Sequence, residues 1–337
     1  MDGHLRSAEA VDGAPRERLH GVQYLRAAAA LQVVLFHASM AAGYPITLGA
    51  LGVPLFFVIS GFIMEVISSP ETRPGGFLRN RFLRIAPLYW LATCTAAAVQ
   101  GGAGKGHLAA SFLFLPWPGA GAEKHFFPVH NVGWTLNYEM FFYGLFALSL
   151  LAPARLRLPV LSAAFLSFVA VGYLVPSDMG AARFWTDPLI LQFLAGAWLG
   201  RWWKGRGSLA WPIGGCVVAI ALLAVPGLHH FQSAVWRGVC AVAILLIVLA
   251  AERRGLLAKP FRPLVLLGDA SYSIYLAHPL VLLGVLALHP PAPILIVAGI
   301  AASIVVGVLC YLWIERPMLR VFRLRTRIAG APVPAGP

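Results

Sequence analysis

The sequence predicts an all-α, polytopic integral membrane protein with about ten transmembrane helices. Three observations support this fold class: 59 % of the 337 residues are hydrophobic, only 12 % are charged, and the mean hydropathy is +0.77. This composition is too apolar for an ordinary soluble domain. Long apolar runs that cross a bilayer must be helical, because backbone groups in hydrocarbon need hydrogen-bond partners within their own segment.

Ten apolar runs divide the chain. We expect a cytoplasmic segment at 1–20 without a removable signal peptide, a membrane domain at 21–316, and a basic cytoplasmic tail at 317–337 that lies disordered on the inner leaflet. The long connection at 102–133 contains an apolar piece too short to cross twice, so we expect an interfacial or re-entrant element there. The ten predicted spans lie near residues 22–43, 48–68, 84–101, 134–152, 158–176, 185–203, 210–226, 233–251, 264–287 and 293–315.

The basic residues of the connections predict the orientation. With the N-terminus in the cytoplasm, 21 of the 26 Lys and Arg residues fall on the inner side and only four on the outer side, and Arg26 is the remaining one. This asymmetry predicts that both termini are cytoplasmic, in a bacterial inner membrane. The net charge of +13 therefore reports topology and contact with membrane lipid, and we expect no nucleic-acid partner.

The first span carries two ionisable residues, Arg26 and His37. Such residues are costly at membrane depth and usually face an internal cavity. They are eleven residues apart, which returns to nearly the same helix face roughly 16 Å further along the axis. The spacing therefore predicts that both side chains point into one cavity at two depths. The alternative is an arginine that reaches to the interface and a histidine that only bonds a neighbouring helix.

Further polar residues interrupt the fourth and ninth predicted spans. The order of the spans places Glu139 in the outer half of the membrane, beside His37, and it places a polar stripe with i, i+4, i+7 spacing on one face of the ninth span. An alternative role for Glu139 and for the histidine of this stripe is a purely structural hydrogen bond between helices. The candidate substrate-binding residues in these two spans are Asn137, Ser271, Tyr275 and His278.

Two arginines precede the third span on the predicted inner side. Arg81 and Arg84 are three residues apart and, in a helix, project on one side. Two guanidinium forks there suit bidentate binding of phosphate groups. Positive charge that only sets the topology is the alternative explanation.

Neither metal binding nor disulfide chemistry is expected. The histidines of the spans come from different helices without a carboxylate at ligand spacing, so we assign no metal. The four cysteines are widely separated in apolar runs, as is typical of buried thiols. They are Cys94, Cys216, Cys240 and Cys310.

Five motifs in order resemble the bacterial acyltransferase family 3 membrane proteins, and in particular their exopolysaccharide-production branch. They are LRAAAALQVVLFHAS, GVPLFFVISGFIM, RFLRIAPLYW, WTLNYEMFFYGLF and SYSIYLAHPL. The resemblance covers about residues 20–320. It implies a ten-helix inner-membrane enzyme that moves an acyl group, usually acetyl, from cytoplasmic acyl-CoA to a hydroxyl of a sugar or polysaccharide precursor. By position, Arg26 and His37 match the family's essential pair, while Arg81 and Arg84 match its arginine pair associated with the acyl-CoA donor.

This chemistry agrees with the residue types. A hydroxyl that attacks a thioester needs a base, and His37 suits that role because the ordinary pKa of imidazole is about 6.5. Glu139 would orient the imidazole, and Arg26 would position a donor phosphate or balance the carboxylate. An acyl-histidine formed by His37 is the alternative mechanism. A carrier or flippase for a polysaccharide precursor is the alternative function, although such proteins show paired broken spans that we do not find. Other polysaccharide-assembly proteins are possible partners.

Overall fold

The computed structural model describes residues 19–118, 126–174, 180–205, 214, 217 and 229–329. Within these ranges every regular element is helical, in agreement with the predicted all-α class. The elements are α1 (His20–Ala41), η1 (Thr47–Leu51), α2 (Gly52–Ile67), α3 (Pro74–Val99), α4 (Lys105–Phe112), η2 (Asn131–Gly133), α5 (Trp134–Ser149), α6 (Arg157–Leu174), α7 (Gly180–Trp185), α8 (Ile190–Trp203), α10 (His229–Arg253), α11 (Arg262–Asp269), α12 (Ser271–Leu286), α13 (Ala292–Cys310), η3 (Tyr311–Glu315) and α14 (Arg316–Ala329).

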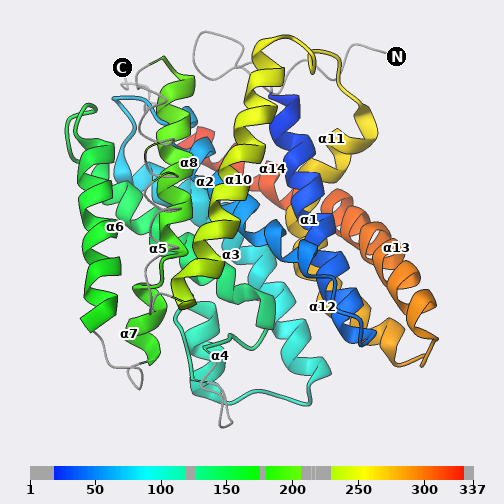
Figure 1. The fold of residues 1–337 in the computed structure, drawn as a ribbon. Coiled ribbons are helices and arrows are strands. Elements are labelled where there is room, and N and C mark those ends of the chain that lie inside the picture. Colours follow the sequence, from blue (N-terminus) through cyan, green and yellow to red (C-terminus); the bar gives the residue numbers. More distant parts are fainter. Residues whose placement is uncertain are drawn as a thin grey trace, which may run out of the picture.

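The helices form one bundle, with α6 and α13 at opposite edges and α2 and α8 packed together between them (Figure 1). The start of α1 and the connection from α10 to α11 lie at one end, and α4 and α7 lie at the other. Helix α1, the first predicted span, packs against α2, α10, α11, α12 and α13, so one of its faces points into the bundle.

Six helical stretches in the described residues are long and apolar enough to span a bilayer, or seven with one bent pair. Nine of the ten predicted spans coincide with helices, and the predicted span 210–226 lies almost entirely outside the described residues. Ten spans are therefore not confirmed. Helices α5 and α8 have only 16 and 14 residues, about 24 and 21 Å at the helical rise of 1.5 Å per residue. They pack inside the bundle, where neighbouring protein replaces lipid.

The ninth predicted span is not one straight helix. Helices α11 and α12 are bent by 68° at a break next to Ala270. Gly268 and Asp269, which end α11, are both weak helix formers. The bend places the first residue of α12, Ser271, inside the protein, where it is fully buried.

The structure has helices in two segments outside the predicted spans, the connection before α5 and the segment after residue 316. The connection before α5 forms the short helix α4 on α3, which confirms an element that does not span the membrane. The prediction of a disordered tail was wrong for residues 317–329, because α14 continues the chain as a helix to Ala329. Its five arginines alternate with apolar residues in a helical pattern, which stabilises a helix at a membrane surface.

Several basic residues of the predicted inner side bond to backbone groups where helices end. Arg201 lies 3.4 Å from Glu65 in a buried ion pair, and it also donates to the carbonyl of Ala154. Lys204 donates to the carbonyls of Glu65 and Ser68 at the end of α2. Cations at helix C-termini are favourable because the last carbonyls lack partners within the helix. These residues therefore hold α2, α8 and the connection after α5 together.

Candidate active site

Two histidines from helices far apart in sequence meet inside the bundle. Nε2 of His278 in α12 lies 3.2 Å from Nδ1 of His37 in α1, and the two ring centroids are 5.0 Å apart. His278 is fully buried and His37 is half-buried. His37 therefore points toward another helix of the bundle, and the cavity that it is predicted to share with Arg26 stays a prediction.

Backbone carbonyls determine which nitrogen of each neutral ring carries the proton. The carbonyl oxygen of Val33 lies 2.9 Å from Nδ1 of His37, and that of Tyr275 lies 2.7 Å from Nδ1 of His278. A carbonyl only accepts, so both Nδ1 atoms are donors. The single Nδ1–H of His37 is then shared between two acceptors, the carbonyl of Val33 and Nε2 of His278, and Nε2 of His37 keeps its lone pair. Among the described residues, none donates a hydrogen bond to that nitrogen, which is the requirement for a base or a nucleophile.

Arg26 faces the same helix as His37, nearer the start of α12. Its Nη2 donates to Oγ of Ser271 at 3.0 Å. The guanidinium also interacts electrostatically with Arg84 and with the carboxylates of Glu315, Asp269 and Glu139. The predicted shared face of Arg26 and His37 is thus confirmed, and α12 is the helix that both residues contact.

The polar stripe on α12 makes interhelical contacts along its length. The hydroxyl of Tyr275 donates to the carbonyl of Val132 at 2.7 Å and lies 2.7 Å from Oγ1 of Thr135. Ser271 bonds Arg26 and His278 bonds His37, as described above. The i, i+4, i+7 spacing therefore correctly predicted one buried polar face, which contacts both α1 and the segment before α5.

The hydrogen bonds of Glu139 join α5 to α2, and among the described residues none of them connects Glu139 to His37. Its carboxylate accepts from Ser60 of α2 at 3.0 Å and from Tyr143 of α5, and it interacts electrostatically with Arg26. The predicted position of Glu139 in the outer half of the membrane therefore stays a prediction. The partner that orients the His37 ring in this structure is His278.

Asn137 is fully buried on α5, and neither polar atom of its side chain has a hydrogen-bond partner among the described residues. A buried amide without partners is costly, so such a group usually serves a ligand or a water molecule. This agrees with its predicted role as a substrate-binding residue and leaves that role a prediction.

The arginines that precede the third predicted span lie on α3. Arg79 is exposed, whereas Arg81 and Arg84 are half-buried and face the interior. Arg81 interacts electrostatically with Tyr143, and Arg84 with Arg26 and Glu315. Arginines that act only as topology signals would not need to be partly buried. The geometry therefore links Arg81 and Arg84 to the polar interior.

Two functional candidates were missed in the sequence. His130 is buried, and its Nε2 lies 2.9 Å from the carbonyl of Leu276, two residues before His278 in α12. Glu315 is fully buried and accepts from Ser273 at 2.6 Å. A histidine directly before a predicted span and a glutamate in the WIERP run were the available signals.

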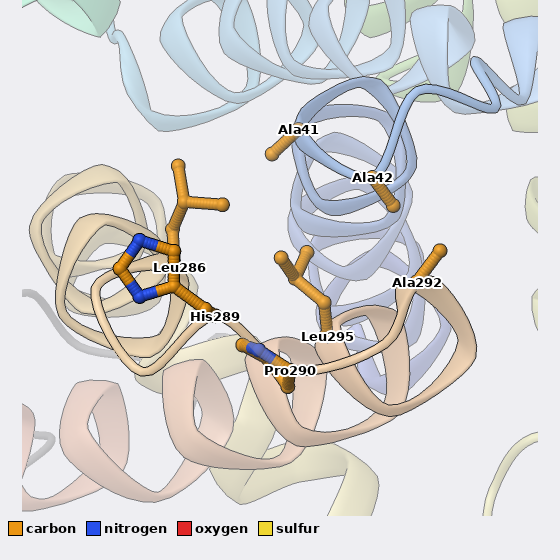
Figure 2. Close-up of a pocket in the computed structure, with 7 residues that line it drawn as sticks. All are labelled: Ala41, Ala42, Leu286, His289, Pro290, Ala292 and Leu295. Atoms are coloured by element: carbon orange, nitrogen blue, oxygen red, sulfur yellow. The ribbon is translucent and has the colours of Figure 1, made fainter.

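A hollow of about 490 Å³ lies beyond His37, between the ends of α1, α12 and α13. Figure 2 shows Ala41, the last residue of α1, and Ala42 across from Leu286 and His289, with Ala292 and Leu295 on α13. Ala41 is one helical turn after His37. The residues that line the hollow are mostly apolar, so it has few groups that would hold a sugar.

Polar residues of α1 and α12 thus form one cluster inside an apolar helical bundle. The chain belongs to the acyltransferase family and is a membrane acyltransferase; it matches the acyltransferase domain over residues 19–312. It is 40 % identical to the exopolysaccharide production protein ExoZ of Rhizobium meliloti, over 88 % of this chain and 98 % of that protein. It is 29 % identical to the putative membrane-bound transacylase BcsY of Komagataeibacter xylinus, over 93 % and 86 %. No solved structure matches the chain.

Proposed function

We propose that this membrane acyltransferase is an O-acyltransferase that moves an acyl group, most simply acetyl, from cytoplasmic acyl-CoA to a hydroxyl of an exopolysaccharide or its sugar precursor. The family assignment and the name of the ExoZ relative support the reaction class and the acceptor. The observation that carries the proposal is the free Nε2 of His37, oriented through His278.

In this mechanism Nε2 of His37 takes the proton of the acceptor hydroxyl while its oxygen attacks the thioester carbonyl. The carbon–sulfur bond then breaks, the ester remains on the acceptor, and the thiolate of CoA leaves and takes up a proton. His278 holds the His37 ring so that Nδ1 keeps its proton and Nε2 stays basic. Tyr275 and Ser271 line the α12 face between the arginines and the histidines, so a donor bound at the arginines would extend along them. Attack by Nε2 itself, giving an acyl-histidine, uses the same geometry.

The proposal is tested with the purified protein, acetyl-CoA labelled in the acetyl group, and exopolysaccharide from a strain that lacks this protein. Transfer of label to the polysaccharide, removable by mild base, is the expected result. A carrier or flippase would leave the acetyl-CoA intact with or without acceptor, which would contradict the enzyme proposal.

Arg81 and Arg84 are expected to bind the phosphates of the donor. Replacing both with Lys keeps the positive charge but removes the forked geometry, so acyl-CoA binding should weaken about tenfold or more, as measured by calorimetry. Arg79→Lys is the matched control, because Arg79 is the exposed arginine of the same helix. Equal affinities in the double variant, the control and the wild type would leave Arg81 and Arg84 with a role in topology only.

We also propose an inner-membrane location with both termini in the cytoplasm. Gly75 and Gly104 are suitable reporters, because a Cβ at either position meets no atom within 4 Å. In a background with the native cysteines replaced by alanine, Gly104→Cys should react with an impermeant maleimide on intact spheroplasts, and Gly75→Cys only after lysis. Labelling of both from outside would contradict this topology.

A further inference from the structure

A second cavity, of about 310 Å³, lies at the end of the bundle where α1 begins, away from the histidine pair. The start of α1, the connection before α11, α11 itself and the junction of η3 with α14 form its walls. The residues that line it are His20, Pro260, Arg262, Val265, Leu266, Asp269, Tyr311 and Arg316. None of them is among the donor or catalytic candidates.

The charge of this cavity is positive. Arg262 and Arg316 are the first residues of α11 and α14, both are exposed, and both belong to its lining. Asp269 is the one carboxylate in the lining, and it interacts electrostatically with Arg26 on the far side. The nearby carboxylate of Glu252 accepts from the backbone N–H groups of His20 and Gly21 at 2.8 and 3.1 Å. Two forked cations thus line an open cavity, an arrangement that suits a phosphate.

Apolar surface adjoins the two arginines. Phe261, directly before Arg262, is 59 % exposed, and Trp313, in the turn before Arg316, is 72 % exposed. Leu266 and Tyr311 form part of the cavity wall. Aromatic residues next to arginines are typical of the depth at which lipid headgroups lie, and the adjoining apolar groups would contact acyl chains.

The rest of this end of the protein is suited to an anionic leaflet. Helix α14, which starts at Arg316, carries five arginines in its 14 residues. Between them lie apolar residues such as exposed Val321 and half-buried Phe322. Basic amphipathic helices bind anionic membrane surfaces, and basic pockets between helices select individual anionic headgroups.

We propose that the cavity between α1, α11 and η3 binds the headgroup of an anionic glycerophospholipid, with its phosphate at Arg262 and Arg316 and its acyl chains along Leu266 and Trp313. The site is separate from the acyl-transfer site, so the lipid is a structural ligand and not a substrate. The bound lipid would connect α11, the first helix of the bent α11–α12 pair, to the start of α14 at the end of the membrane domain. Helix α12 of this pair carries Ser271 and His278.

The test measures binding of phosphatidylglycerol and phosphatidylcholine to the delipidated full-length protein in mixed micelles, by native mass spectrometry and by the rise in Tm with lipid. The wild type should bind phosphatidylglycerol at least tenfold more tightly than phosphatidylcholine. Arg262→Gln with Arg316→Gln should remove this preference. The matched control is Arg73→Gln with Arg254→Gln, two exposed arginines outside the cavity lining, which should keep it.

An unchanged preference in the Arg262/Arg316 variant would overturn the proposal. So would saturation of the site by inorganic phosphate or by CoA at concentrations below those needed for phosphatidylglycerol, because the site would then serve a soluble anion. If the double variant is not monodisperse, Arg316→Gln alone is used, and it should weaken phosphatidylglycerol binding at least threefold.

Discussion

Replacing His37 with Gln should lower acyl transfer by roughly 10²–10⁴-fold, the usual contribution of one general base, while the affinity for acyl-CoA stays within twofold. Gln has a polar side chain of similar reach, so it can still donate to the carbonyl of Val33 and approach His278. It has no basic lone pair in place of Nε2. Single-turnover transfer of labelled acetyl and binding of acetyl-CoA, measured on the same preparation, separate chemistry from donor binding.

Two controls make this result specific. His37→Ala leaves space for a ring, so added imidazole should restore part of its activity and should leave the Gln variant unchanged. A Gln variant that expresses well and retains activity within a few-fold of the wild type would make His37 structural, and the base would then be sought at His278 or Glu139. Label that stays on denatured wild-type protein but not on the Gln variant would favour the acyl-histidine route.

Local periodicity explains which parts of the site could be predicted from sequence. The eleven-residue spacing of Arg26 and His37, and the stripe from Ser271 to His278, depend only on helical geometry within one element. The structure confirms both faces and shows that they face each other. Polar residues on one face of each of two apolar helices were sufficient to predict this part of the site.

Depth was harder to predict than direction. The predicted depth of Glu139 treats every span as a full crossing of the bilayer, whereas α5 has only 16 residues and α11 is bent by 68° from α12. The start of a helix depends on tertiary contacts, such as the bond from Tyr275 to the carbonyl of Val132 that ties down the turn before α5. No pattern within residues 134–152 shows these contacts.

His130 was missed for a related reason. It belongs to a connection, and its hydrogen-bond partner, Leu276, lies 146 positions later in the chain. The helix at 316–329 was not predicted, because the prediction of a disordered tail rests on the charge of this segment and leaves out its helical periodicity. The arginines there recur among apolar residues in a way that a helical projection would have shown.

Gly61 and Gly196 should tolerate no side chain at all. A Cβ on Gly61 would lie 1.9 Å from the carbonyl oxygen of Phe193, and a Cβ on Gly196 would lie 1.9 Å from that of Val58. Each glycine of the α2–α8 pair thus meets the backbone of the other helix, the close approach that small residues provide between membrane helices. Neither carbonyl can rotate away, because both belong to helices.

Alanine at either position must therefore push α2 and α8 apart and disturb the buried pair of Glu65 with Arg201 at their ends. Overpacking of a tight core costs about 1–3 kcal/mol, and a backbone clash belongs at the upper end of that range. We expect Gly61→Ala and Gly196→Ala each to lower the Tm in detergent by about 5 °C or more. Gly144→Ala in α5 and Gly284→Ala in α12 are the controls, since no atom lies within 4 Å of a Cβ there. Alanine is the better helix former, so their Tm should stay level or rise; equal Tm values in all four variants would show that α2 and α8 are not in backbone contact.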